Sequence, residues 1–210
     1  MNIDDRVRDI IRRLKKRYPG MRIPLRFSAP HELLVATILS AQCTDERVNI
    51  VTASLFKKYR TIDDYADADP SALEKDIHST GFFRNKAKNI IGAMKMLRGR
   101  YHGEIPRTME GIITLPGVAR KTGNIVLGHA FGIIEGIAVD THVIRISRLL
   151  KLTRETTPEK IERDLMKIVP RADWLQFSLL IQTLGRDVCK ARAQNHAACV
   201  LRDICPSAGI

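Results

Sequence analysis

Apolar residues recur along this chain at the three- and four-residue spacing of amphipathic α-helices, and this pattern limits the fold more than any other feature. Its first instance is carried by Ile3, Val7, Ile10, Ile11, Leu14 and Tyr18. Pro19-Gly20 then predicts the end of that helix. Runs of strand length with alternating apolar and polar residues are absent from the sequence. We therefore expect an all-α protein.

Residues with a helix-capping side chain stand in front of several other periodic stretches. They are Ser28 before Pro30, Asp69 before Pro70, Thr108, and Thr157 before Pro158. Residues 31–42, HELLVATILSAQ, are apolar on nearly every side, so we expect a helix buried in the middle of the fold. No internal repeat and no Gly/Ser-rich linker divides the sequence.

The chain is strongly basic, since 35 Lys and Arg residues against 23 Asp and Glu give a formal net charge of +12. This charge favours a polyanionic partner, nucleic acid first, because neutralising phosphates releases condensed counterions. A solvated basic surface without such a partner would also explain it. Charged residues interrupt every apolar stretch of the N-terminus, and the longest largely apolar run, residues 33–41, is too short to span a bilayer. We expect an intracellular protein without a membrane anchor.

Residues 108–132 predict a helical hairpin: a short helix, a tight turn over residues 115–119, and a second helix that opens near Arg120. Pro116 and Gly117 supply the turn. The first turn of the second helix presents unpaired N–H groups and the positive end of the helix dipole, which suit a DNA phosphate and do not read sequence. An ordinary packing corner between two helices is the alternative.

Three of the four cysteines, Cys189, Cys199 and Cys205, fall within the last 22 residues. In a reducing compartment clustered cysteines bind metal more often than they form disulfides. The density therefore predicts metal ligation. Cys43 is far away in sequence, in an apolar segment, and we expect it to serve in packing.

Four blocks of the sequence together resemble the endonuclease III family of helix-hairpin-helix DNA glycosylases. In chain order they are LLVATILSAQCTD, TGFFRNKAKNI, LPGVARKTGNIVLGHAFG and GIAVDTHVIRISRL. Their order and spacing agree with the family, and they extend the resemblance over essentially the whole chain. One departure is Ala119, where the family usually has glycine; if that position needs a positive φ, alanine costs energy.

The resemblance implies a two-lobed fold. One lobe would be a six-helix barrel over residues 24–133, with the helix-hairpin-helix at 108–132. The other would combine residues 1–23 and 134–210 and carry an iron-sulfur loop at 189–205. The active site would lie in the cleft between the lobes, with duplex DNA across its mouth.

The resemblance also implies catalytic roles for Lys121 and Asp140. The dipole at the start of its helix disfavours a cation, so Lys121 would be favoured as the neutral amine that attacks the sugar C1′, expels the damaged base and forms a Schiff base. Asp140 would activate this nucleophile or stabilise the sugar cation. Taken alone, Lys121 is interpreted as a solvated or phosphate-binding lysine and Asp140 as a helix N-cap.

Attack on C1′ requires the nucleotide to leave the base stack, so a side chain must fill the gap. The resemblance implies Gln42 as the gap filler and Phe82 as a wedge, although two adjacent phenylalanines are also typical of a core. The hairpin residues expected at the DNA backbone are Leu115, Gly117, Ala119, Arg120 and Thr122.

The family's metal signature is C-x6-C-x2-C-x5-C around a [4Fe-4S] cluster, and it aligns here with Cys189, His196, Cys199 and Cys205. His196 stands in place of the second cysteine. Imidazole can replace thiolate on iron and raises the reduction potential, so a Cys3His cluster is chemically reasonable. Tetrahedral zinc, a three-cysteine cluster and the absence of metal are the alternatives. The role would be structural, fastening the C-terminal loop to the N-terminal helix.

These inferences predict a bifunctional DNA glycosylase and abasic-site lyase that removes oxidised pyrimidines, such as thymine glycol, from duplex DNA. The alternatives are a monofunctional mismatch or alkylated-base glycosylase of the same fold, and a non-catalytic DNA-binding module, which would leave Lys121 and Asp140 without purpose. We expect a monomer that binds damaged duplex DNA, in the cytoplasm and nucleoid of a prokaryote.

Overall fold

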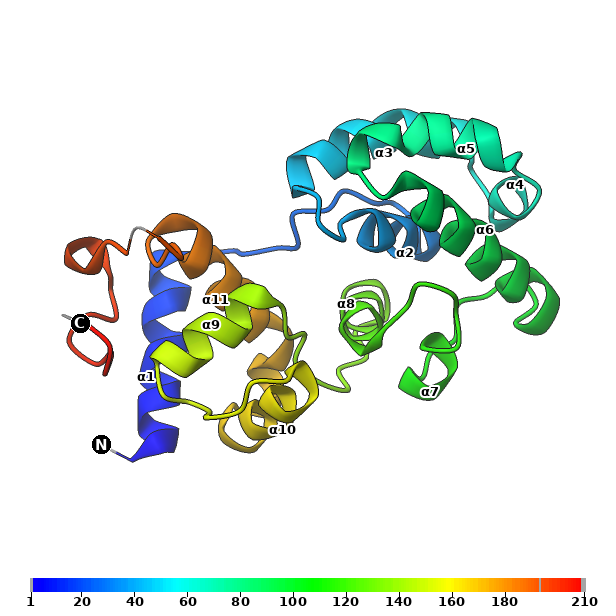
Figure 1. The fold of residues 1–210 in the computed structure, drawn as a ribbon. Helices are drawn as coiled ribbons and strands as arrows, with labels where there is room; N and C mark the ends of the chain where they lie inside the picture. Colours follow the sequence, from blue (N-terminus) through cyan, green and yellow to red (C-terminus); the bar gives the residue numbers. More distant parts are fainter. Residues whose placement is uncertain (1, 193, 209–210) are drawn as a thin grey trace. The chain divides into compact units, whose positions relative to one another are not determined.

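The computed structural model describes residues 2–192 and 194–208, in which the regular structure is helical apart from one antiparallel β-bridge between Cys189 and Gln194 (Figure 1). The all-α prediction is confirmed. The chain divides into two compact units, one formed by Ile23–Glu135 and the other by Met1–Arg22 together with Gly136–Ile210. None of the helices in the described ranges combines the length and the apolar character that a membrane span requires.

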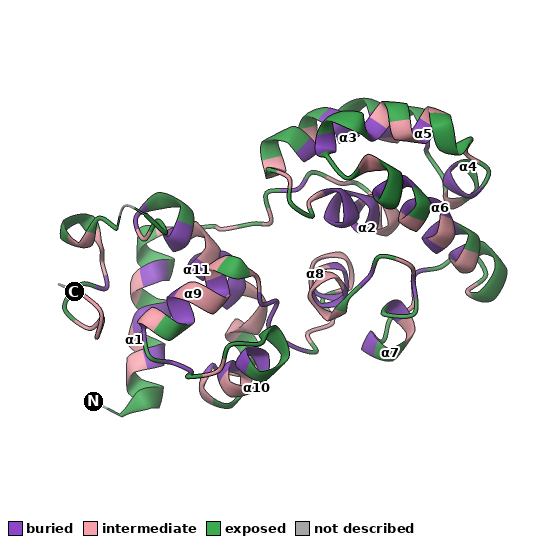
Figure 2. Cartoon of the chain, viewed as in Figure 1, coloured by how far each residue is buried: buried purple, intermediate pink, exposed green. Residues whose placement is uncertain are grey.

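The Ile23–Glu135 unit is built around one central helix. Its elements are α2 (Pro30–Leu39), α3 (Asp45–Lys58), α4 (Ile62–Ala66), α5 (Pro70–Ile77), the 3-10 turn η1 (His78–Thr80), α6 (Phe83–Arg100), α7 (Met109–Ile112) and α8 (Arg120–Phe131). Helix α2 packs against α3, α6 and α8, and every residue from Leu33 to Leu39 is buried (Figure 2). The prediction of a buried helix over this stretch is confirmed.

The capping signals were mostly located correctly. The Asp69 carboxylate accepts the N–H of Ala72 at 2.8 Å at the start of α5. The Thr108 hydroxyl accepts the N–H of Gly111 at 3.2 Å at the start of α7. The prediction for Ser28 was wrong, because α2 begins with Ala29 as its N-cap. The Glu32 carboxylate accepts the N–H of Ala29 at 3.1 Å, which is a different hydrogen bond from the one that a capping serine makes to an N–H of the first turn.

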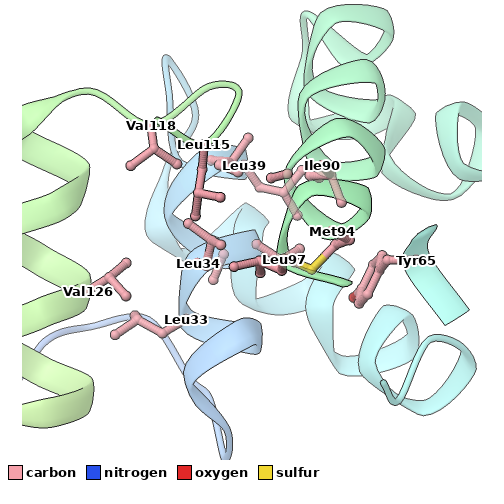
Figure 3. Packing of buried hydrophobic residues seen from close by; sticks show 14 of the residues in the cluster. Leu33, Leu34, Leu39, Tyr65, Ile90, Met94, Leu97, Leu115, Val118 and Val126 are labelled. Carbon is pink, nitrogen blue, oxygen red and sulfur yellow. The ribbon is translucent and has the colours of Figure 1, made fainter. Parts of the chain in front are cut away.

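The core of this unit also fixes the hairpin turn. Leu115 and Val118 of the turn are 2% and 6% exposed. In Figure 3 they lie beside the buried side chains of α2 and α6, with Leu115 directed toward Leu34 and Leu39. Because burying such a side chain contributes roughly 1.5–3 kcal/mol, the core determines where the second hairpin helix begins.

The other unit brings both ends of the chain together. It contains α1 (Ile3–Arg17), α9 (Thr141–Leu149), α10 (Pro158–Ile168), the 3-10 turn η2 (Arg171–Asp173), α11 (Trp174–Asp187) and the 3-10 turn η3 (His196–Ala198). The apolar stripe predicted for the first helix is buried at Val7, Ile10, Ile11 and Leu14. Helix α1 packs against α10 and α11, and α9 packs against α11.

The C-terminal loop is attached to α1 through one arginine. The Arg13 guanidinium donates to the Asp203 carboxylate, with Nη2 and Oδ2 at 2.9 Å, and to the carbonyl of Val200 at 3.1 Å. Leu201, between these two acceptors, is 1% exposed. The loop that carries Cys199 and Cys205 is therefore held against the N-terminal helix.

Candidate active site

The helical hairpin of α7 and α8 turns at a glycine. Gly117 has φ of +76°, and a Cβ atom at this position would lie 2.8 Å from the Cβ of Asn89 on α6. Only glycine satisfies both the left-handed backbone and this close approach. The side chain of Leu115 is buried, so contact between Leu115 and a phosphate would involve its backbone.

Ala119, the departure from the family pattern, fits its position without strain. It is the N-cap of α8, with φ of −91° and ψ of 171°, which is ordinary extended backbone. Alanine offers no side-chain acceptor to the first turn of the helix, and no side-chain cap hydrogen bond is formed there. The first turn of α8 carries the N–H groups of Lys121 and Thr122, to which Ala119 offers no side-chain acceptor.

Lys121 lies in this first turn and is partly exposed. Two residues further along, Gly123 lets α8 approach α7: a Cβ at Gly123 would lie 2.8 Å from the Sδ of Met109 and 3.1 Å from Cγ2 of Ile112. The N–H of Gly123 donates to the carbonyl of Ala119 at 3.0 Å, the first hydrogen bond of the helix. The backbone that carries Lys121 is thus fixed by close packing on one side and leaves its side chain accessible.

Asp140 belongs to the other unit, where it is the N-cap of α9. Its Oδ1 accepts the N–H of Val143 at 2.8 Å, which fixes the rotamer of the carboxylate. Ile137, Ala138 and Val139, directly before it, are all buried. Nearby, burial lowers the pKa of His142, and the negative charge of Asp140 opposes that shift. The buried residues before Asp140 and the hydrogen bond to Val143 after it therefore both hold the carboxylate in place.

Gln42 and Phe82 are both exposed residues of the Ile23–Glu135 unit. Phe82 is 62% exposed, whereas Phe83 is partly buried and packs against the core. Both Gln42, with φ of +52°, and Phe82, with φ of +49°, adopt the left-handed conformation. Phe82 is thus available at the surface, as a wedge would be.

Sequence reasoning overlooked one residue of this region, Lys86 on α6. It is 4% exposed, and its Nζ donates to the carbonyls of Leu39 and Thr80, each at 2.8 Å. The signal was present in the sequence, because Lys86 shares a helical face with the apolar Ile90. A lysine on the apolar face of a helix needs partners that only the tertiary structure can supply.

The four predicted metal ligands gather in the C-terminal loop. Cys189, His196, Cys199 and Cys205 line one pocket, together with apolar side chains such as Leu150 and Leu184. Arg145 donates to the Sγ of Cys189 at 3.6 Å, and His196 Nε2 lies 3.0 Å from Oε1 of Gln194. Within residues 2–192 and 194–208, no three His, Cys, Asp or Glu side chains are already arranged as metal ligands. The donor set suits a thiolate-ligated metal, and its side chains share one pocket.

Comparisons with known proteins agree with this fold. Residues 35–171 match the family model of the HhH-GPD superfamily base excision DNA repair protein. Endonuclease III of Synechocystis sp. is 55% identical over 203 residues, which cover 97% of this chain and 93% of the relative. Endonuclease III of Bacillus subtilis is 44% identical over 189 residues, covering 90% of this chain and 86% of the relative.

Comparison with solved structures also finds DNA repair proteins of similar fold. That of a trapped endonuclease III–DNA covalent intermediate has a TM-score of 0.93 at 41% identity and covers 99% of this chain and 98% of that chain. A thermostable thymine-DNA glycosylase has a TM-score of 0.87 at 21% identity, which is a likeness of fold alone. The helical fold and its hairpin thus define a base-excision DNA repair protein of the HhH-GPD superfamily. Within that superfamily the chain belongs to the endonuclease III family.

Proposed function

We propose that this protein is a bifunctional DNA glycosylase and abasic-site lyase, which removes oxidised pyrimidines such as thymine glycol from duplex DNA. Membership of the endonuclease III family supports base-excision repair. The lyase activity is inferred from the position of Lys121, which is partly exposed in the first turn of α8, directly after the hairpin turn. The chain that contains Lys121 is 41% identical to the endonuclease III whose covalent intermediate with DNA was trapped and solved.

The proposed chemistry begins at the Lys121 amine. Its lone pair attacks the sugar C1′ while the bond from C1′ to the base breaks, and the base leaves. The amine gives up a proton to the departing base, and the bond from C1′ to the ring oxygen then opens as that oxygen takes a proton from solvent, which leaves a protonated imine with Lys121. Removal of a proton from C2′ then expels the 3′ phosphate and cleaves the strand. Asp140 would assist by accepting a proton or by stabilising positive charge on the sugar.

The remaining surface of the Ile23–Glu135 unit would hold the DNA. The N–H groups of Lys121 and Thr122 at the start of α8 suit a phosphate, since the N-cap Ala119 offers them no side-chain acceptor. The backbone at Leu115 and Gly117 and the residues Arg120 and Thr122 would complete this contact. Gln42 would fill the gap left by the flipped base, and the exposed Phe82 would act as the wedge. The net charge of +12 supports a nucleic acid as the partner, and family membership supports damaged duplex DNA.

We infer that the C-terminal loop holds a [4Fe-4S] cluster through Cys189, His196, Cys199 and Cys205. Their common pocket and the soft donors of the three cysteines support this assignment. When bound, the cluster would supply a structural cross-link, adding to the attachment that Arg13 already makes between the loop and α1. The monomeric state and the location in the cytoplasm and nucleoid stay predictions, while the bacterial relatives support a bacterial source.

Lys121→Ala tests the lyase assignment. We expect sodium borohydride to trap the wild-type protein on a duplex with a single thymine glycol, and no adduct with Lys121→Ala, because the imine cannot form. The matched control is Lys95→Ala, which removes an exposed lysine of α6 in the same unit and should trap normally. If the base is released but no adduct forms, the protein is a monofunctional glycosylase. If there is no base release and no adduct, the substrate class is wrong or the chain only binds DNA.

Asp140→Asn separates the capping role of this residue from its chemical role. Asparagine caps a helix about as well as aspartate, so the free energy of unfolding should change by less than about 0.5 kcal/mol in urea titrations. The rate of thymine glycol release should fall about 10²- to 10⁴-fold, because the charge and the proton acceptor are lost. Asp69→Asn makes the same change at the N-cap of α5 and should leave the rate unchanged. Equal rates for the two variants would exclude a chemical role for Asp140.

Metal content and redox behaviour test the cluster. We expect protein purified without oxygen to contain iron and sulfide in the ratio of a [4Fe-4S] cluster. His196→Cys should lower its reduction potential, because thiolate replaces imidazole on iron. His196→Ala should lose iron more readily. An unchanged potential and an unchanged rate of iron loss would indicate three cysteine ligands, and zinc in place of iron would overturn the assignment.

A further inference from the structure

Lys86 is a buried ammonium for which the chemistry described above has no use. Its side chain lies inside the Ile23–Glu135 unit, and burial lowers its pKa. An ammonium taken out of water is costly unless hydrogen bonds replace its hydration. The carbonyls of Leu39 and Thr80 provide that replacement, each at 2.8 Å from Nζ.

The two carbonyls belong to segments that are distant in sequence. Leu39 is the last residue of α2, and Thr80 is the last residue of η1. Carbonyls at the ends of helices lack intrahelical partners, and the carbonyl of Leu39 also lies at the negative end of the α2 dipole, so a cation is well placed there. Lys86 thereby joins the loop after α2 to the loop after η1.

These two loops carry the proposed gap filler and wedge. Gln42 follows Leu39 by three residues, and Phe82 follows Thr80 by two. Both have positive φ, at +52° and +49°, although neither is glycine. A left-handed backbone costs roughly 1–2 kcal/mol for such residues, and it persists only where the surrounding structure holds it.

We infer that Lys86 is a positioning residue that holds the Gln42 loop and the Phe82 loop in a fixed relation, so that both side chains enter the duplex together. This inference rests on the proposed function, because it presumes that Gln42 and Phe82 act on a flipped nucleotide. It predicts that loss of Lys86 slows strand cleavage in a stacked duplex more than strand cleavage in a single strand, which has no base stack to open.

Lys86→Met tests this relation, since methionine has a similar length and makes no hydrogen bond to the two carbonyls. We compare strand cleavage at an abasic site in a duplex with cleavage at the same site in a single strand. The duplex rate should fall about ten- to a hundredfold more than the single-strand rate, as expected for a misplacement of about an ångström. Phe82→Ala should change the ratio in the same direction. Combining the two substitutions should give less than the product of their separate effects.

Two further variants control for the fold. Lys95→Met makes the same exchange at an exposed position of α6 and should leave the ratio unchanged. Lys86→Arg keeps a charged donor and should recover part of the duplex activity; it also provides the comparison if Lys86→Met does not fold.

Equal losses on both substrates, or no loss on either, would overturn the positioning role and leave Lys86 as a residue of the core. A wild-type protein that cleaves neither substrate would instead show that the proposed function is wrong.

Discussion

The hairpin that presents Lys121 depends on the burial of its own turn. Leu115 and Val118 insert into the core around α2, and Gly117 packs so closely on Asn89 of α6 that no side chain fits. The interior around Leu115 and Val118 is packed too densely to let the turn shift. The start of α8 therefore has one position, and the N–H groups proposed to bind phosphate are fixed before any DNA arrives. Rigid placement of this kind is what a nucleophile and its anion site require.

The loops proposed to enter the duplex follow a different principle. Gln42 and Phe82 are exposed and have left-handed backbones, so local preference opposes their conformations. Their stability must come from neighbours, and Lys86 donates to a carbonyl shortly before each of them. Strained, exposed residues supported by a buried polar contact are typical of surfaces that act on a ligand.

Patterns that depend on local sequence were predicted well. The first helix, the buried α2 and the hairpin all follow from apolar spacing and turn residues, and the structure confirms them. The error at Ser28 arose because the N-cap of α2 is Ala29, one residue later, and the N–H of Ser28 donates to the Glu32 carboxylate. Lys86 was overlooked because its partners, Leu39 and Thr80, are brought to it only by the tertiary fold. The extended backbone of Ala119 could not be predicted either, since the spacing of residue types does not determine a dihedral angle.

Catalytic roles lie beyond what periodicity can predict. Lys121 and Asp140 were selected by resemblance, and local structure gives each a simpler description, as a first-turn lysine and an N-cap. The family membership of the chain supports the chemical interpretation, and the geometry of each residue is compatible with it.

The most direct test of this account is to identify the amine that carries the sugar. After borohydride reduction of the reaction on thymine glycol DNA, nuclease and protease digestion followed by tandem mass spectrometry would locate the modified residue. We expect a single modified peptide with the deoxyribose remnant on Lys121. A remnant on any other lysine or on the N-terminal amine would contradict it.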